Sequence, residues 1–268
     1  MDKYKNVSPE QAAFLRKQRN DRLQIRTIQW MLFAVFLISW ELASDLGCIN
    51  SFIFCSPSII GSCFIQMIRD GMLFQHIGIT LLETIISFCI VILASILIAI
   101  ALWWNPKLSK IVEPYMVILN SLPKSALAPI LIVWLGANYK TIIVCAISVA
   151  IFGSILNIYT GFITVEPDKL KLIRTLGGNR MDCLRLVVIP SSRENILSIM
   201  KVNIGLCLVG VIIGEFLAAR AGLGYLIIYG SQVFKMDWVL LGIILLCIIA
   251  MILYLILQKI EKKFRLHT

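Results

Sequence analysis

Charged residues are scarce in this sequence, and this scarcity excludes most classes of water-soluble protein. Only 15% of the 268 residues are Asp, Glu, Lys or Arg, whereas 59% are hydrophobic. A soluble domain of this length needs far more polar surface than such a composition supplies. The excess apolar surface must therefore face something other than water, and a lipid bilayer is its usual partner.

Residues that build catalytic and metal sites are also few. Histidine occurs only at His76 and His267, which is too few for a zinc site or a Ser-His-Asp triad. The phosphate-binding pattern Gly-x4-Gly-Lys-Ser/Thr is absent, and the pair Gly177-Gly178 lacks the strand and the lysine that phosphate binding requires. We therefore expect no catalytic residue, no metal and no bound cofactor in this chain.

The cysteines and the net charge exclude two further classes. The eight cysteines are spread along the chain, unlike those of a small disulfide scaffold. Cys48, Cys55 and Cys63 share one segment and can pair, but spacing does not fix their connectivity. The net charge of +10 forms no basic stripe with interleaved aromatic residues, so we expect no nucleic-acid partner.

Long apolar segments are abundant, and six of them are long enough to cross a bilayer. They cover residues 26–45, 77–104, 111–135, 140–162, 202–219 and 237–258. Three prolines interrupt the third segment and blur its bounds. The sequence thus predicts an all-α membrane protein with about six transmembrane helices. A tail over residues 1–26 precedes a transmembrane domain over residues 27–268, whose first segment we expect to remain as an anchor and not be cleaved.

The basic residues predict the orientation of these spans. With the N-terminus in the cytoplasm, 20 of the 25 lysines and arginines lie on the cytoplasmic side and four lie outside. Reversing the chain would invert this strong positive-inside bias. We therefore expect both termini in the cytoplasm. On the outside, residues 56–72 have helical apolar spacing and predict a short surface helix.

The cytoplasmic segment 164–190 differs from an ordinary connecting loop, and we call it the elbow. Glu166-Pro167-Asp168 is a good helix start, and Leu170, Ile173 and Leu176 form an apolar face on the helix that follows. Gly177-Gly178 supplies a residue able to adopt positive φ where that helix stops. Asn179 can then cap a second helix, which presents Met181, Leu184, Val187 and Val188 before Pro190 ends the pattern. The apolar face indicates either a docking element or a segment packed on the membrane surface or on the spans, and the pattern alone does not choose.

Several motifs carry a resemblance to a known family. Gly177, followed after nine residues by Val187-Val188-Ile189-Pro190, resembles the Gly-x9-Ile-x-Leu-Pro cytoplasmic signature of ABC importer permeases. Further stretches resemble the nitrate/sulfonate/taurine branch. They are Leu122-Pro123-Lys124-Ser125-Ala126-Leu127-Ala128-Pro129 with Trp134-Leu135-Gly136, Glu215-Phe216 with Gly222-Leu223-Gly224-Tyr225-Leu226-Ile227, and Ser56-Pro57-Ser58.

The resemblance implies a type I ABC importer permease fold, in which the elbow supplies coupling helices between spans four and five. It implies partners as well: two copies of a cytoplasmic ATP-binding subunit that binds ATP and Mg, a second permease copy in a homodimer, and a binding protein outside. The residues that it assigns to ATPase coupling are Lys171, Leu172, Ile173, Leu176, Gly177, Gly178, Arg180, Leu184 and Pro190. One departure affects this set, because the family signature usually begins Glu-Ala-Ala whereas Lys171-Leu172-Ile173 stands here. A basic residue thus replaces an acidic one, and contacts at Lys171 stay open.

Polar residues inside the spans are candidates for the translocation path, because each is costly in lipid without water or a partner. They are Asn120, Ser121, Lys124, Glu83, Asn203 and Glu215. Lys124 lies between two prolines and can attract an anionic solute, but it can also pair with Glu83 or Glu215 or reach an interface. For Glu83 and Glu215 structural roles are favoured, and Asn203 predicts an interhelical hydrogen bond.

The resemblance implies that the chain is the permease subunit of an ABC importer for a small anionic or heterocyclic solute, in the plasma membrane of a prokaryote. A secondary transporter or channel that works without an ATPase is the alternative, although no internal repeat supports it and the elbow would then have no role.

Overall fold

The computed structural model describes residues 9–47, 49–50 and 52–265, and all regular structure within them is helical. Five of these helices are long and apolar enough to span a membrane, and a bent pair brings the number to six if it counts as one span. The prediction of an all-α membrane protein with about six spans is therefore confirmed. The chain divides after Cys63 into two compact units, each of which is described by itself below.

The first unit contains helix α1 (Pro9–Asp45) and the start of α2 (Pro57–Arg69). Residues 9–26, expected as a tail, continue without a break into the apolar stretch Leu23–Asp45. The Glu41 carboxylate accepts hydrogen bonds from the Ser58 backbone N–H (3.1 Å) and hydroxyl (2.6 Å), which joins α1 to the first turn of α2. Helix α2 confirms the short helix predicted over residues 56–72.

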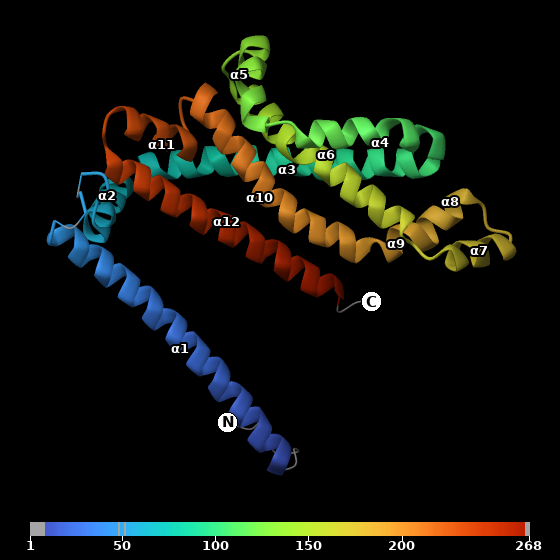
Figure 1. The fold of residues 1–268 in the computed structure, drawn as a ribbon, viewed down its shortest axis with the longest axis horizontal. Helices are drawn as coiled ribbons and strands as arrows, with labels where there is room; N and C mark the ends of the chain where they lie inside the picture. Colours follow the sequence, from blue (N-terminus) through green and yellow to red (C-terminus); the bar gives the residue numbers. More distant parts are fainter. Residues whose placement is uncertain (1–8, 48, 51, 266–268) are drawn as a thin grey trace. The chain divides into compact units, whose positions relative to one another are not determined.

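The second unit is built on four long helices, α3 (Met72–Trp104), α6 (Tyr139–Ile163), α10 (Arg193–Ala218) and α12 (Met236–Arg265). Helix α6 packs against both α3 and α10, and α12 packs along α10 (Figure 1). Glycines allow the close approach of α10 to α6, because a Cβ at Gly210 would lie 2.6 Å from Ala146 Cα. The packed core includes Leu102, Ile158, Phe162 and Val188.

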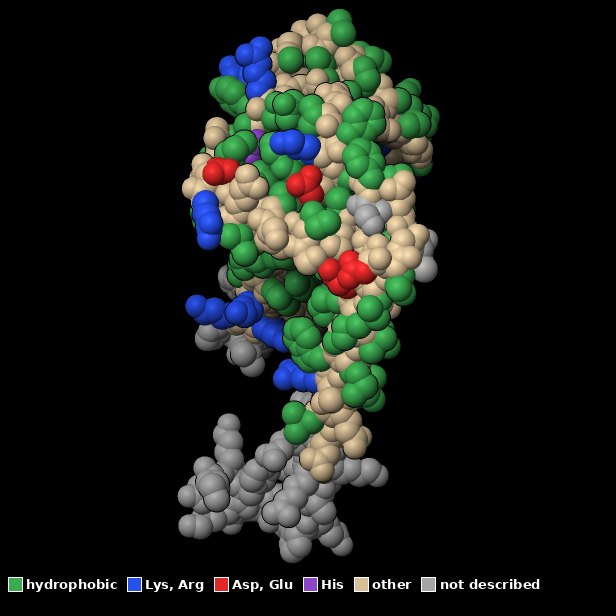
Figure 2. All heavy atoms as spheres, turned by 90° about the vertical axis from the view of Figure 1, so that its left-hand side faces the viewer, with side chains coloured by type: hydrophobic (Ala, Val, Ile, Leu, Met, Phe, Trp, Pro, Cys, Tyr) green, Lys and Arg blue, Asp and Glu red, His purple; other side chains and the backbone are tan. Residues whose placement is uncertain are grey.

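The outward faces of these helices are apolar. Leu93 and Leu97 on α3 and Met251 on α12 are exposed, as lipid-facing side chains of a span would be. Figure 2 shows hydrophobic side chains over much of the face in view, with charged side chains in small groups between them. This distribution confirms the exposed apolar surface that the composition indicates.

The third predicted span, residues 111–135, is not one straight helix. It consists of α4 (Pro106–Ser121) and α5 (Lys124–Leu135), which meet at 94°. The bend occurs at Leu122-Pro123, where proline restricts the preceding residue to an extended conformation. Pro114 and Pro129 lie within the two helices.

Shorter helices close the two ends of the four-helix core. Helix α7 (Pro167–Thr175), α8 (Arg180–Cys183), a π-helical turn (Leu184–Val188) and α9 (Ile189–Ser191) connect α6 to α10. Helix α11 (Leu223–Gln232) lies at the opposite end of α10 (Figure 1). The fifth span begins at Arg193, nine residues before the predicted start, because the chain bends at Ser192 and then stays helical.

Candidate functional site

A line of polar residues runs between α6 and α10 within otherwise apolar helices. Its deeper part is a cavity of about 360 Å³. The cavity is lined by Asn120, Gly153, Asn157, Ser198, Ile199, Val202, Asn203 and Leu206. Three helices contribute to it, since Asn120 comes from the end of α4. Asn120 and Asn203, both predicted path residues, are therefore brought together in one cavity.

Local packing holds together the helices around the deeper cavity. The Asn203 side-chain amide donates to Ser154 Oγ at 2.8 Å, and both residues are buried. This bond confirms the interhelical hydrogen bond predicted for Asn203. Gly153 lets the end of α4 approach α6, because a Cβ there would lie 3.2 Å from Asn120 Oδ1.

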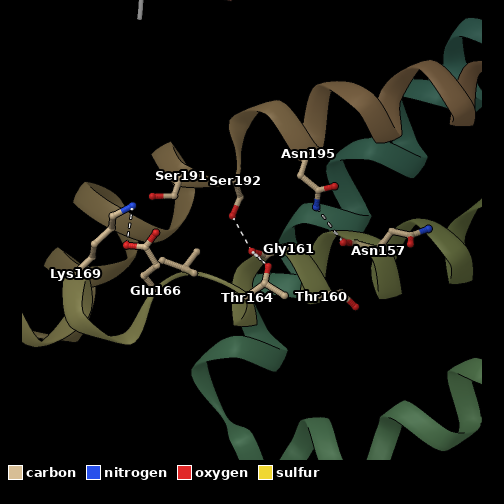
Figure 3. A pocket seen from close by; sticks show the side chains of 10 residues that line it. Asn157, Thr160, Gly161, Thr164, Glu166, Lys169, Ser191, Ser192 and Asn195 are labelled. Atoms are coloured by element: carbon tan, nitrogen blue, oxygen red, sulfur yellow. Dashed lines mark hydrogen bonds and ion pairs between the residues drawn. The ribbon is translucent and has the colours of Figure 1, made fainter.

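A second cavity, of about 400 Å³, continues the line toward α7. It is lined by Asn157, Thr160, Gly161, Thr164, Val165, Glu166, Lys169, Ser191, Ser192 and Asn195 (Figure 3). Asn157 lines both cavities, so the polar surface is continuous along α6. The Asn195 amide donates to the Asn157 carbonyl (3.2 Å) and Ser192 Oγ to the Gly161 carbonyl (3.1 Å), which holds α10 against α6 at this end.

The other predicted path residues lie outside both cavities. Lys124 Nζ donates to the carbonyl oxygens of Leu119 (2.7 Å) and Asn120 (2.5 Å). It thereby satisfies two free carbonyls at the end of α4 and stabilises the bend, and it does not pair with Glu83 or Glu215. Ser121 Oγ donates to the Val117 carbonyl of its own helix (2.9 Å).

Glu83 and Glu215 lie in a separate buried cluster where α3, α10 and α11 meet. The Glu215 carboxylate accepts hydrogen bonds from Thr80 Oγ1 and from the Gly224 backbone N–H. Both glutamates are absent from the lining of the two cavities. Their surroundings agree with the structural role that the sequence favours.

The first half of the elbow has the predicted form. Helix α7 begins at Pro167, with Asp168 in its first turn, and Gly177 adopts φ +85° just after the helix ends. No residue of α7 is buried; Leu172 on the helix is 58% exposed, and Leu176 just after its last residue is 76% exposed. Lys171, where the family has an acidic residue, forms an ion pair with Asp168 at 2.9 Å.

Gly178 lies where the chain turns tightly onto α7. A Cβ at Gly178 would lie 2.9 Å from the Ile173 carbonyl oxygen, so glycine is required for the close approach. Asn179 then forms a capping box with Asp182, which confirms the predicted cap of the second helix. Gly177 and Gly178 therefore set the turn between the two helices. Leu170 of the predicted apolar face packs against the core and Ile173 is half-buried beside Gly178, so the exposed apolar side chains here are Leu172 and Leu176.

The second half of the elbow packs against the bundle, which corrects part of the predicted coupling set. Leu184 is buried in the core beside Val188, so it cannot present its side chain to a partner. Arg180 donates to the Trp103 carbonyl (3.0 Å) and lies over the Trp103 and Trp104 rings, which ties α8 to the end of α3. Pro190 does not break the helix, because a π-helical turn precedes it and the helical path continues.

Sequence reasoning missed several residues that line the cavities. They are Asn157, Thr160, Asn195 and Ser198. Asn157 and Thr160 interrupt the predicted span 140–162, whereas Asn195 and Ser198 precede the predicted start of the fifth span at residue 202. Their signal is a recurrence every three or four residues, as in Gly153, Asn157 and Gly161 on α6, which places them on one helix face. Two facing helices with such stripes indicate a polar line inside a membrane domain.

Comparison with known proteins identifies the family. Residues 91–266 match the family described as binding-protein-dependent transport system inner membrane component. The chain is 24% identical over 262 residues to the taurine transport system permease protein TauC of Escherichia coli, covering 91% of this chain and 95% of TauC. It is 23% identical over 233 residues to the putative aliphatic sulfonates transport permease protein SsuC of Bacillus subtilis, covering 87% and 84%.

Solved structures agree on the fold. A chain of the inward-facing MetNI methionine ABC transporter superimposes with a TM-score of 0.63 at 16% identity, covering 73% of this chain and 97% of that chain. A chain of a bacterial ABC transporter that imports the acidic polysaccharide alginate gives 0.65 at 13% identity, covering 94% and 98%. Together with the polar line through the helices and the exposed elbow, these matches show that the chain belongs to the inner membrane components of binding-protein-dependent transport systems and is the permease of an ABC importer.

Proposed function

We propose that a small solute crosses the membrane along the polar line between α6 and α10. The single observation that carries this proposal is that two polar cavities share Asn157 and follow two membrane helices. Polar side chains at bilayer depth are costly unless they face water, a partner or a cargo. In the deeper cavity the lining consists of amides, a hydroxyl and aliphatic side chains, without a charged group.

The solute is small and anionic or heterocyclic. Relatives carry names for taurine, aliphatic sulfonates, formylaminopyrimidine and riboflavin, and this range supports the class without selecting one member. The uncharged lining of the deeper cavity suits a path that several such solutes can follow, because amides donate and accept hydrogen bonds alike. Discrimination between solutes then rests with a binding protein outside the membrane.

A second copy of the chain completes the path. Asn120, Asn157 and Ser198 are exposed on the single chain although they line a cavity within membrane helices. Exposure of these groups to lipid would be unfavourable, and a facing copy related by two-fold symmetry would cover them. The homodimer is therefore part of the proposal.

Helix α7 docks on a cytoplasmic ATP-binding subunit, one for each permease copy. The exposed Leu172 on α7 and Leu176 just after it offer an apolar patch at the end of the bundle, and the second half of the elbow is fixed to α3 through Arg180. Movement of the ATPase can therefore be passed to the bundle, which alternates between inward- and outward-facing states. ATP and Mg bind to the partner, and both termini of this chain lie in the cytoplasm, as the distribution of basic residues favours.

Substitution of Asn157 tests the path. Asn157→Leu, reconstituted with the ATPase and the binding protein, should lower the uptake rate by about tenfold or more, because a path residue loses both its donor and its acceptor. Ser148→Val on the same helix is the matched control, since Ser148 Oγ bonds only its own helix at the Cys145 carbonyl and lines neither cavity. Unchanged uptake in Asn157→Leu, with normal ATP hydrolysis, would show that the solute does not follow this polar line.

A further inference from the structure

A buried polar cluster at the α11 end of the bundle has no part in the cavities or the elbow. Its centre is a pair of glutamates, Glu83 on α3 and Glu215 on α10, which are 3% and 0% exposed. Each lies within an apolar helix, where an unpaired charge would be strongly unfavourable. The hydrogen bonds around the pair show how this cost is met.

Glu215 is surrounded by hydrogen-bond donors on both oxygens. Thr80 Oγ1 donates to Oε1 at 2.6 Å, and the Gly224 backbone N–H donates to Oε2 at 2.5 Å. The second donor belongs to the first turn of α11, a ten-residue helix whose dipole is positive at that end. Two donors and a helix N-terminus beside the carboxyl group favour its ionised form.

The remaining donors of this turn are already engaged. The Leu223 backbone N–H donates to Thr80 Oγ1 (2.8 Å), so the single hydroxyl proton of Thr80 is directed at Glu215. The Gly222 N–H donates to His76 Nδ1 (3.0 Å), so this nitrogen carries no proton. His76 in turn stacks on Tyr225 of α11, with ring centroids 6.2 Å apart. None of these donors is directed at Glu83.

Glu83 therefore lacks the hydrogen-bond donors that surround Glu215. Its Oε2 is buried without a hydrogen-bond partner among the described residues. Its carboxyl group lies within hydrogen-bonding reach of Glu215. Ion pairs join Glu166, Asp168 and Glu261 to lysines, whereas neither Glu83 nor Glu215 forms an ion pair with a described residue. No described cation thus compensates a second negative charge in this cluster.

We propose that Glu83 is a proton-binding site, a neutral carboxylic acid that donates its proton to the Glu215 carboxylate. The pair then holds one proton and one negative charge, which the Thr80 hydroxyl and the α11 amides compensate. Loss of the proton would leave two facing carboxylates in a buried site and would push α3 away from α10 and α11. Glu83 is thus a positioning residue that acts through Glu215 on the turn before α11, and it has no contact with the solute.

The proposal predicts an asymmetry between two otherwise equivalent substitutions. Glu83→Gln keeps an N–H donor for Glu215, so thermal stability should be retained and uptake should stay within about twofold of the parent. Glu215→Gln places an amide NH2 group against a backbone N–H or the Thr80 hydroxyl, so the yield of folded protein or the uptake should fall about tenfold or more. The reverse pattern would indicate that Glu215 carries the proton. An equal loss of stability or uptake in both variants would indicate that neither glutamate carries one. Either result overturns the assignment.

Infrared spectroscopy of the full chain in lipid detects the proton on Glu83 directly, because a glutamate with a purely structural role would give no band of a buried carboxylic acid. The parent should show the carbonyl-stretch band of a buried protonated carboxylic acid at neutral pH, with a shift in D2O, and Glu83→Gln should lack that band. If Glu83→Gln cannot be recovered, Glu83→Asp serves instead, because it keeps an acid and should displace the band. A parent spectrum without such a band at neutral pH, or a band unchanged in both variants, would overturn the proposal.

Discussion

At the scale of single residues, the glycines of the Gly222-Leu223-Gly224 motif provide space as well as conformation. Gly222 has φ +119°, and a Cβ at that position would fall on the Glu215 carboxyl group. A Cβ at Gly224 would lie 2.8 Å from Glu215 Oε2. The motif Glu215-Phe216 with Gly222-Leu223-Gly224 therefore describes one arrangement, in which a carboxylate reaches the backbone of the turn that follows it.

Gly222→Ala should destabilise the folded protein by about 2–3 kcal/mol, since it combines an unfavourable φ with a clash against Glu215. Gly205→Ala on α10 is the matched control, because nothing lies within 4 Å of the Cβ it adds, and its stability should be equal or slightly higher. Thermal unfolding of both variants in detergent would measure the difference. Equal melting temperatures would contradict the packing described for Gly222.

Lys124→Met should leave the apparent affinity for the solute unchanged and lower stability by about 1 kcal/mol. The reason is that Lys124 Nζ bonds the last carbonyls of α4 and lines neither cavity. Lys124→Arg, which keeps a cation at this bend, is the control and should behave as the parent. A rise in the Michaelis constant for uptake in Lys124→Met alone would indicate that Lys124 contacts the solute along its path.

At the scale of elements, the sequence predicts those features of a helix that neighbouring residues determine, such as its start, its end and its cap. The start of α7 at Pro167, the positive φ of Gly177 and the cap at Asn179 follow from neighbouring residues, and the structure confirms all three. The course of α4 and α5 does not follow in this way, because prolines mark a break without giving its angle. Likewise, apolar spacing in the second half of the elbow does not tell a docking face from a core face, and Leu184 belongs to the core.

The two halves of the elbow should respond differently to polar substitution. The double variant Leu172→Ser and Leu176→Ser should fold normally and lose most of its binding to the ATPase, since both side chains are exposed. Leu184→Ser should instead cost about 2–4 kcal/mol of stability, because it removes a buried core side chain. Co-purification in mild detergent, together with thermal unfolding, separates the two effects. Full ATPase binding in the double variant would exclude α7 as the docking element.

At the scale of the whole molecule, the sequence identifies the class better than the site. Long apolar segments and motif order are enough for the membrane fold and the family, which the comparisons confirm. The path depends on which faces of α6 and α10 meet, and a single sequence does not contain that pairing. Asn203 was found because a lone amide in a span needs a partner, whereas Asn157 becomes significant only once both cavities are seen to share it.

Transport by this chain should depend entirely on its ATPase partner. Under the proposed function, the energy that moves the bundle comes from a separate ATP-binding subunit through α7. Vesicles that contain the chain alone should show no solute flux above that of protein-free vesicles. Addition of the ATPase, ATP, Mg and the binding protein should start uptake, and a non-hydrolysable ATP analogue should not. Flux through the chain alone, driven by a solute or ion gradient, would instead establish a secondary transporter or channel.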